Sequence, residues 1–342
     1  MLKIDLHTHI LPFDWPDLNA RFGSSGFPTL ERTGCGCGRI VIDGRPFRKI
    51  RDNSWAAEAR LVDLERTGVD VQVLSTVPVM FCYWAEPQHA AELARIINDQ
   101  IAAVVSEHPT RFIGLGTLPL QRPQLAVAEL ERCVRELGFA GCEIGTHVNE
   151  WNLDHAELFP VFEAAAELGA ALFVHPWDMM GGEQMRKYWL PWLVGMPAET
   201  SRAACSLIFG GVLERLPQLR VALAHGGGAF PWTIGRIEHA FHVRPDLVAV
   251  DNPIAPRAYL DRFYYDSIVH DPAALRFLIE RVGIERVALG SDDPFPLGES
   301  VPGQLIESLA ELTDDAKQRL LAGTALEFLA LEGSRWTSAT PG

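Results

Sequence analysis

The feature of this sequence that most constrains its fold is a regular alternation of short apolar segments with longer helical patterns. Segments such as ALFV (171–174) and RVALA (220–224) are apolar almost throughout. Such runs are typical of strands that are buried on both faces of a parallel sheet. The pattern predicts eight strands, at residues 2–7, 69–76, 112–118, 141–145, 171–175, 220–225, 263–267 and 286–291.

Helical patterns separate these strands, and two more follow the last one. They lie at residues 56–67, 88–108, 124–137, 158–168, 198–215, 229–241, 272–282, 301–312 and 314–322. Parallel strands joined by helices need crossover connections, and eight of them can close a barrel. With 48% hydrophobic residues the chain has ample apolar surface for such a core. We therefore predict an α/β fold, a (β/α)8 TIM barrel, as a single domain over residues 1–342.

The stretch of about residues 11–53 is far longer than an ordinary connection between a strand and a helix. Within it, IVIDGRPF (40–47) predicts a hairpin with Asp43 and Gly44 in the turn. An insertion after the first strand lies at the catalytic face of a barrel. The inserted lobe could therefore form a lid or supply a binding side chain, or it could be a decorative loop.

Polar side chains stand where several of the predicted strands end. In KIDLHTH (3–9), His7 and His9 are two residues apart and project to the same side of a strand. His175, His225 and Asp292 come directly after three other strands. A pair of histidines alone is a weak signal, but in a barrel these strand ends meet at one mouth. Imidazole and carboxylate groups there predict a site for a divalent metal such as zinc.

The chemistry of the five side chains divides their roles. Three nitrogens and one oxygen, from His7, His9, His175 and Asp292, leave a position open for water, whose pKa the metal lowers to about 7. His225 is then a general base or acid beside that water, or alternatively a fifth ligand. A second metal would want a bridging ligand on the fourth strand; no lysine is there, and Glu143 can be an interior residue. One metal is expected.

Large apolar residues gather in the loop after the fifth strand. They are Trp177, Met179, Met180, Trp189 and Trp192. They could be core, or they could form an apolar wall for a flat, unsaturated substrate. The glycines at 226–228 permit a tight turn after His225 and a close approach of backbone to a ligand.

Charge and cysteine content narrow the setting. The net charge of −14 argues against nucleic acid and anionic membranes as partners, whereas arginines beside a cation could still bind an anionic substrate. No secretory signal or apolar run of about 20 residues is present. Six scattered cysteines fit the reducing cytoplasm, and Cys35 with Cys37 offers too few ligands for a structural zinc site.

Several segments, in this order, carry a family resemblance. HTH (7–9), FVHPWD (173–178), AHGGG (224–228) and GSD (290–292) followed by PFPLGE (294–299) resemble the amidohydrolase superfamily and its metal-dependent decarboxylase branch. STVPVMF (75–81), GLGTLP (114–119), GTHVNEW (145–151) and YWLPWLVGMPAET (188–200) are similar to the 2-amino-3-carboxymuconate 6-semialdehyde decarboxylase family. The resemblance covers nearly the whole chain.

That resemblance implies an amidohydrolase-type barrel that holds one zinc ion per subunit through His7, His9, His175 and Asp292, with His225 as the acid/base residue. It also implies that Arg48 binds substrate carboxylates, and that a homodimer places Arg236 in the neighbouring subunit's site. Met179, Trp192 and Phe295 would line the pocket. The implied reaction is non-oxidative loss of CO2 in tryptophan (kynurenine) or 2-nitrobenzoate catabolism.

One departure concerns the residue after Asp292, which is usually Tyr in the family and is Asp293 here. A second carboxylate could alter the electrostatics of the site, or bind the metal in place of Asp292. Other functions also fit this set of residues. The alternatives are decarboxylation of an aromatic acid of the resorcylate or carboxyvanillate type, hydrolysis of an amide or lactone, and a barrel that binds metal without catalysis.

Overall fold

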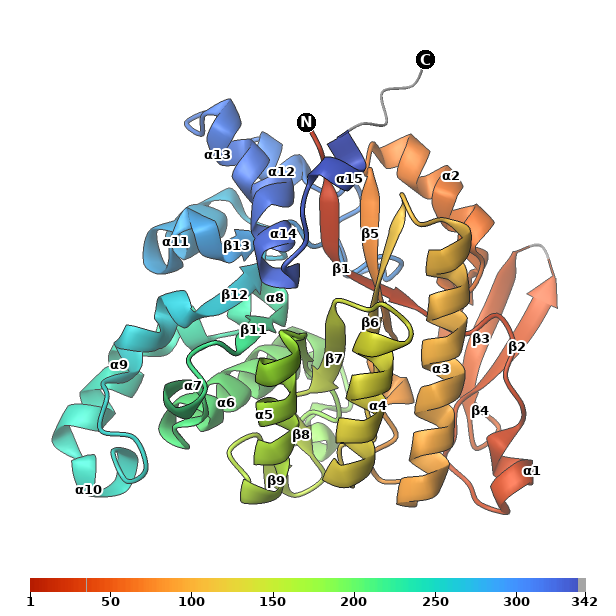
Figure 1. Ribbon diagram of the computed structural model, residues 1–342, viewed down its shortest axis with the longest axis horizontal. Coiled ribbons are helices and arrows are strands. Elements are labelled where there is room, and N and C mark those ends of the chain that lie inside the picture. Colours follow the sequence, from red (N-terminus) through yellow and green to blue (C-terminus); the bar gives the residue numbers. More distant parts are fainter. Residues whose placement is uncertain (35, 338–342) are drawn as a thin grey trace.

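A computed structural model describes residues 1–34 and 36–337 of the chain. Eight parallel strands form its central sheet, in the order in which they occur in the sequence (Figure 1). They are β1 (Ile4–Ile10), β5 (Val71–Thr76), β6 (Phe112–Gly116), β7 (Gly141–Gly145), β10 (Ala171–His175), β11 (Arg220–Leu223), β12 (Phe263–Asp266) and β13 (Val287–Ala288).

The chain after β13 closes the sheet against β1. Leu6 donates its backbone N–H to the carbonyl of Leu289, and Asp292 donates to that of His7, both at 2.8 Å. Thr8 and Asp293 form an isolated parallel bridge further along. The predicted (β/α)8 barrel is confirmed. β1 extends to Ile10, three residues beyond its predicted end, so His9 lies within the strand.

Helices cover the outside of the barrel (Figure 1). They are α2 (Ala57–Thr67), α3 (Pro87–Glu107), α4 (Pro123–Arg135), α5 (Phe159–Leu168), α6 (Met196–Phe209), α7 (Val212–Arg215), α9 (Phe230–Val243), α10 (Pro245–Val248), α11 (Pro272–Val282), α12 (Gln304–Glu307), α13 (Asp314–Gln318), α14 (Thr324–Leu329) and α15 (Ser334–Thr337). Further short elements are α8 (Ala224–Gly227), β8 (His147–Val148) and β9 (Trp151–Asn152).

Three helix predictions were wrong in extent. The helix predicted at 198–215 is divided into α6 and α7 because Gly211 has a left-handed backbone, with φ of 66°. The helix predicted at 301–312 is reduced to α12, which begins after Gly303 at a φ of 85°. The last predicted helix, at 314–322, continues instead through a π-helical turn (Arg319–Gly323) into α14.

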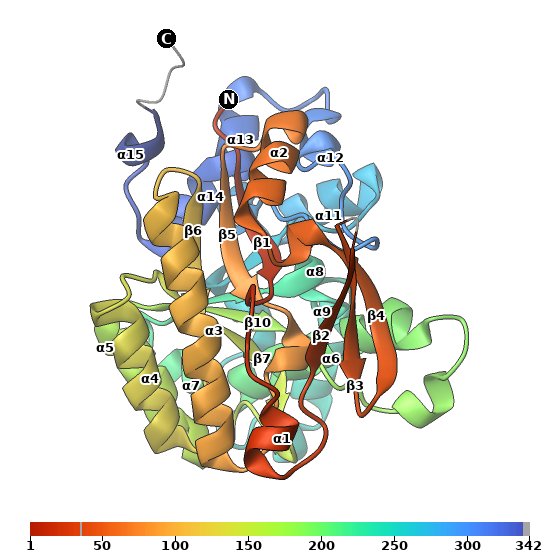
Figure 2. The ribbon, with the colours of Figure 1, turned by 90° about the vertical axis from the view of Figure 1, so that its right-hand side faces the viewer.

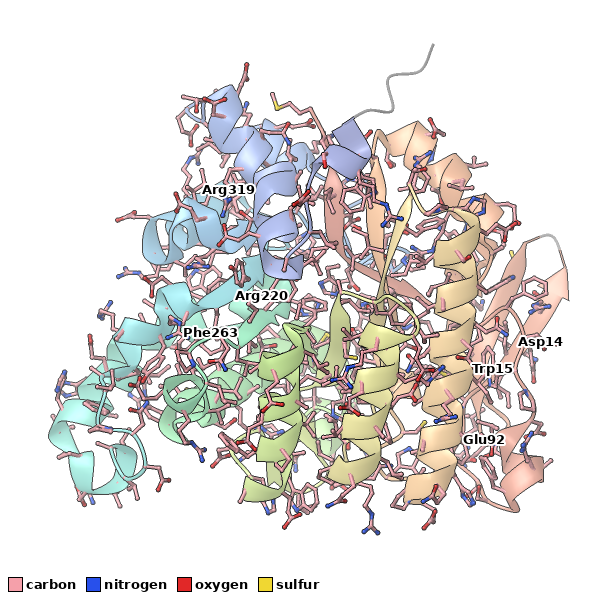
Figure 3. The ribbon with its side chains drawn as sticks, in the orientation of Figure 1. Asp14, Trp15, Glu92, Arg220, Phe263 and Arg319 are labelled. Carbon is pink, nitrogen blue, oxygen red and sulfur yellow. The ribbon has the colours of Figure 1, made fainter. Side chains whose placement is uncertain are left out.

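The C-terminal helices close the end of the barrel at which the strands begin. Ala325 and Phe328 of α14 and Trp336 of α15 pack with Ile4 and Leu6 in one buried apolar cluster. Arg220, at the start of β11, donates a 2.7 Å hydrogen bond to the carbonyl of Phe328, beside α14 (Figure 3). This closure leaves the opposite end, where the strands finish, as the open mouth.

The insertion after β1 forms the expected lobe beside α3 (Figures 1 and 2). It contains α1 (Leu18–Phe22) and an antiparallel sheet of β2 (Thr29–Gly34), β3 (Cys37–Ile42) and β4 (Arg45–Arg51). Asp43 and Gly44 make the predicted turn, both with positive φ, as a tight hairpin requires. Gln100 of α3 holds the lobe through a 2.8 Å hydrogen bond to the carbonyl of Asp14 (Figure 3).

Gly228, in the turn after β11, generates a prediction about the fold. Its φ of 61° and ψ of −129° are accessible only to glycine. A Cβ there would lie 2.4 Å from the carbonyl oxygen of Pro197. Gly228→Ala should therefore cost about 3 kcal/mol of unfolding free energy or more, measured by urea denaturation.

The matched control for this variant is Gly235→Ala on the exposed face of α9, where an added Cβ meets nothing within 4 Å. Because alanine favours a helix, this variant should gain about 0.5–1 kcal/mol. Equal effects of the two substitutions would contradict the assigned backbone strain.

Candidate metal centre and substrate pocket

His7 and His9 place two imidazole nitrogens face to face inside the barrel mouth. The Nδ1 of His7 lies 2.7 Å from a carboxylate oxygen of Asp266, and that of His9 lies 2.8 Å from the carbonyl of Thr76. These acceptors require a proton on each Nδ1, which leaves both Nε2 atoms unprotonated in the neutral rings. The two Nε2 atoms are only 3.0 Å apart. Two lone pairs this close need a shared cation, either a metal ion or a proton between the two nitrogens.

His175 and Asp292 complete the same cluster. The Nδ1 of His175 donates to the carbonyl of Pro176 at 2.8 Å, and its buried Nε2 has no hydrogen-bond partner among the described residues. The Oδ1 of Asp292 is 3.2 Å from the Nε2 of His9. It too has no hydrogen bond of suitable geometry among the described residues. Ligand atoms around a zinc-like ion at about 2.0–2.2 Å are separated by about 3.0–3.5 Å. The four residues therefore fit a divalent metal.

His225 lies at the edge of this cluster. Its ring centre is 5.1 Å from that of His7 and 5.0 Å from that of His175, and its Nε2 is 4.0 Å from Asp292. Burial, together with the positive charge of His7, lowers the pKa of His225 to about 4. The imidazole is therefore neutral near pH 7 and can accept a proton. Ligand atoms of His225, His7, His175 and Asp292 all lie within 4.8 Å of one another, so His225 could be an acid/base residue or a further metal ligand.

Asp266, at the end of β12, is a functional residue that the sequence reasoning missed. Besides accepting from His7, its carboxylate accepts from the backbone N–H groups of His225 (2.7 Å), Gly226 (2.8 Å) and Ile268 (3.1 Å). Burial opposes its ionisation, but these partners and the charge of His7 lower its pKa. One carboxylate thus orients both a metal-binding ring and the backbone of His225. The position of Asp266 at the end of a predicted strand was the signal that could have marked it as a site residue.

The structure separates the two neighbouring acids after β13. Asp292 has a left-handed backbone, with φ of 61°, and faces the histidines. Burial opposes ionisation of its carboxylate, but the histidines lower its pKa to about 2. The carboxylate of Asp293 lies instead 3.3 Å from Arg60 and 3.2 Å from the side-chain nitrogen of Gln72. Asp292 is therefore the acid that is available to a metal.

Glu143 is on β7 and is buried within the barrel, as expected for an interior residue. Its Oε1 is 3.6 Å from the Nδ1 of His9, and its carboxylate could join His9 and His175 around an ion. Burial, with the negative charge of Asp292, raises the pKa of Glu143 well above its usual range. Without a second cation it is therefore a neutral acid.

A pocket of about 500 Å³ opens beside the metal-binding cluster, lined by residues of the lobe and of the segment after β10. Its walls include the predicted residues Met179, Trp192 and Phe295. Arg48 of β4 enters it, with its guanidinium 4.5 Å from the ring centre of Phe295 and 5.4 Å from that of Trp192. Further apolar lining comes from Phe47, Val79, Trp84, Trp177, Trp189 and Met196.

Arg48 is an unpaired cation in an apolar setting. Burial lowers its pKa, and within the described part of the chain no carboxylate lies within ion-pair distance of its guanidinium. Arg236 is elsewhere: it is exposed on α9 and lines no part of this pocket. A second hollow, of about 430 Å³, reaches His225 from the side of Trp232 and Met196. The cluster is therefore open on two sides.

With this geometry in place, comparison with known proteins identifies the family. Residues 4–331 match the family model described as amidohydrolase. The chain belongs to the amidohydrolase family. The 2-amino-3-carboxymuconate-6-semialdehyde decarboxylase of Dictyostelium discoideum is 57% identical, covering 98% of this chain and 93% of the relative. This amidohydrolase is thus an enzyme of the metal-dependent decarboxylase branch.

Two solved structures support the same placement. The 5-carboxyvanillate decarboxylase of Sphingomonas paucimobilis is 31% identical, with a TM-score of 0.75 over 82% of this chain and 84% of that one. The dihydroxybenzoic acid decarboxylase of Polaromonas sp. JS666, solved with manganese and 2-nitroresorcinol, shares the fold at 22% identity. Its TM-score is 0.75 over 98% of this chain and 99% of that one. Both structures share the barrel fold of this amidohydrolase, and its own histidine cluster fits a divalent metal.

Two further expectations concern the rest of the chain. The structure has no helix, within the residues it describes, that is long and apolar enough to cross a membrane. Cys35 lies outside the described residues, so its pairing with Cys37 is not tested.

The environment of His225 generates a prediction about pH and stability. Its folded-state pKa of about 4 is below the ordinary value of 6.5, so the unfolded chain takes up a proton first as the pH falls. Stability that is present above pH 6.5 is therefore lost towards pH 4, by about 3 kcal/mol for this group. Metal-free wild type should lose more unfolding free energy between pH 7 and pH 4.5 than His225→Gln, by urea denaturation.

The control is His242→Gln, which removes an exposed histidine from α9 and should follow the wild type. Identical pH profiles for wild type and His225→Gln would contradict a neutral, buried His225.

Proposed function

We propose that this amidohydrolase is a zinc-dependent, non-oxidative decarboxylase of 2-amino-3-carboxymuconate 6-semialdehyde. The products are 2-aminomuconate 6-semialdehyde and CO2. The observation that carries the proposal is a cluster of histidine and aspartate ligands that fits a divalent cation. It lies beside an apolar pocket that contains Arg48, which has no ion-pair partner among the described residues. The identity of 57% with a decarboxylase of that substrate supports the choice of reaction.

The pocket suits a flat, conjugated anion. Aromatic rings of Trp192 and Phe295 flank the guanidinium of Arg48, which keeps it extended and largely dehydrated. A planar guanidinium binds a carboxylate through two parallel hydrogen bonds, which a lysine cannot do. We assign Arg48 to a substrate carboxylate and the aromatic walls, with Met179, to the unsaturated chain.

Decarboxylation breaks one carbon–carbon bond and makes one carbon–hydrogen bond. The electron pair of the broken bond stays on the substrate and must be stabilised until a proton arrives there. His225 is neutral in its buried position and lines the second hollow, so we assign it to accept a proton from solvent and deliver that proton to the carbon. A divalent ion, when bound, supplies positive charge and lowers the pKa of a coordinated water.

Zinc is the proposed metal, one ion per subunit. Zinc accepts imidazole and carboxylate ligands, and His9 has its Nε2 3.0 Å from that of His7 and 3.2 Å from Asp292. Ligand atoms of His7, His175 and Asp292 also lie within 4.8 Å of one another. Cys82, Cys133, Cys142 and Cys205 form no disulfide bond within the described part of the chain, which supports the reducing cytoplasm as the location. The proposed pathway is tryptophan (kynurenine) or 2-nitrobenzoate catabolism.

We also propose a homodimer in which Arg236 enters the partner's site. Arg236 is exposed one turn after Trp232, whose ring is also exposed and lines the second hollow. Val243, Leu247 and Val250 continue an exposed apolar face along the end of α9 and α10. Such a face is suited to a subunit interface.

The experiment that tests the function follows the absorbance of freshly generated 2-amino-3-carboxymuconate 6-semialdehyde while CO2 is recorded. Zinc-loaded protein should release one CO2 for each substrate consumed, and metal-stripped protein should release it only at the uncatalysed rate. His175→Ala should behave as metal-stripped protein does, because its Nε2 has no other partner. No CO2 from folded, zinc-loaded protein would overturn the assigned substrate.

The second candidate is decarboxylation of an aromatic acid, because a 5-carboxyvanillate decarboxylase shares the fold at 31% identity. CO2 release from carboxyvanillate or resorcylate, without turnover of the semialdehyde, would favour it. A metal-dependent amide or lactone hydrolase would consume water and release no CO2.

The role of Arg236 gives a separate prediction by subunit mixing. Arg48→Ala and Arg236→Ala should each be inactive, and an equal mixture should regain about one quarter of wild-type activity, because half the dimers then contain one intact site. Exchange is verified by mass spectrometry of differently labelled subunits. Arg45→Ala, on the same strand as Arg48 but outside the pocket, is the control and should stay active. A mixture that exchanges but stays inactive would contradict the role of Arg236 in trans.

A further inference from the structure

Arg60 of α2 is a charged residue in an unusual place. Only 1% of its surface is exposed, and it is the largest of the fully buried side chains. Most buried arginines are paired, because removing an unpaired guanidinium from water is strongly unfavourable. Its partners are therefore informative about why the chain keeps a charge there.

The guanidinium joins three parts of the barrel. One nitrogen, Nη1, donates to the side-chain oxygen of Gln72 on β5 at 2.7 Å and lies 3.3 Å from the carboxylate of Asp293. The other, Nη2, donates to the backbone carbonyl of His9. Gln72 in turn donates to the same oxygen of Asp293 at 3.2 Å. Arg60, Gln72 and Asp293 thus form one network, in which Arg60 and Gln72 are buried and the side chain of Asp293 is 24% exposed.

This network is joined to two of the proposed metal ligands, His9 and Asp292. It contacts the backbone of His9 on β1, and it contains the residue that follows Asp292. Asp293 is further tied to β1, because its carbonyl accepts from the N–H of His9 at 2.8 Å. His9 and Asp292 are the two proposed ligands whose donor atoms lie 3.2 Å apart. A shift of Asp293 would therefore move Asp292 relative to His9.

We propose that Arg60 and Asp293 act as a positioning pair that sets the separation of the His9 and Asp292 ligand atoms, and so the affinity for the metal. The inference rests on the ligand set of the proposed function. It assigns a purpose to Asp293, the residue that departs from the family pattern. The carboxylate at this position is held by the opposite charge of Arg60, and the side chain of Asp292 is left free to face the histidines.

Loss of an ion pair that only stabilises the fold should have a different effect from loss of the Arg60–Asp293 pair. Arg132 and Glu129 form such a pair on α4, at 2.7 Å and mostly buried, with the aromatic pocket and the histidines elsewhere. Loss of that pair should lower the unfolding free energy and leave metal binding unchanged. Arg132→Gln is therefore the matched control for Arg60→Gln.

The test measures zinc affinity by competition with a chromophoric chelator, on protein whose fold is verified by circular dichroism. Arg60→Gln and Asp293→Asn should each bind zinc about 10- to 100-fold more weakly than wild type, the range found when support of a ligand is lost. The double variant should be no weaker than the weaker single variant, because both substitutions break one network. The absorption bands of cobalt-substituted protein should also change, since they report ligand geometry.

Asp293→Asn keeps the size of the side chain and so preserves a folded sample if Arg60→Gln unfolds. Wild-type zinc affinity in folded Asp293→Asn, or equal weakening by Arg132→Gln, would overturn the positioning role. His175→Ala separates the two proposals: if it leaves zinc binding unchanged, the ligand set itself is wrong. If it abolishes binding while the Arg60 and Asp293 variants bind normally, only the positioning pair is wrong.

Discussion

The mutual approach of the His7 and His9 Nε2 atoms, 3.0 Å apart, is the interaction on which the rest of this structure depends. Two neutral imidazoles repel at that distance if both point lone pairs inward, so the arrangement needs a metal ion or a proton between the two nitrogens. Everything that surrounds the pair fixes this orientation. Asp266 and the carbonyl of Thr76 hold the two Nδ1 protons on the far side of the rings. The second partner of each ligand is therefore as necessary to the site as the ligand itself.

Closure of the barrel brings these ligands together. Asp292 follows β13 and His9 lies within β1, so their contact exists only because the last strand returns to the first. The left-handed backbone at Asp292 and at His225 turns each side chain from the strand direction into the mouth. Such conformations are unfavourable for residues other than glycine, and the surrounding hydrogen bonds hold them. Asp266 does so for His225, and the bond to the carbonyl of His7 does so for Asp292.

Residue pattern was enough to predict the barrel and the identity of the clustered side chains, because strand ends of a closed parallel sheet must meet. β7 and β10 have the predicted bounds, and the two-residue spacing of His7 and His9 fixes their common side. Local pattern could not assign Asp266, because its role depends on backbone N–H groups about 40 residues away. Nor could it find the partner of Asp293, since Arg60 is far away in sequence. The helix at 301–312 failed because the backbone of Gly303 interrupts an otherwise helical pattern.

The distribution of charge explains how a protein of net charge −14 can receive an anion. Burial keeps Glu143 protonated, which removes a negative charge from directly below the cluster. Asp293 is neutralised by Arg60, and Asp266 by its hydrogen bonds to His7 and to backbone N–H groups. Asp178 and Asp292 are the carboxylates among the described residues that line the pocket, and Arg48 is the cation that faces them. A bound divalent ion would make the charge at the pocket floor positive, and the apolar walls would lengthen the reach of that field. Binding of an anionic substrate therefore depends as much on which carboxylates are protonated or paired as on which cations are present.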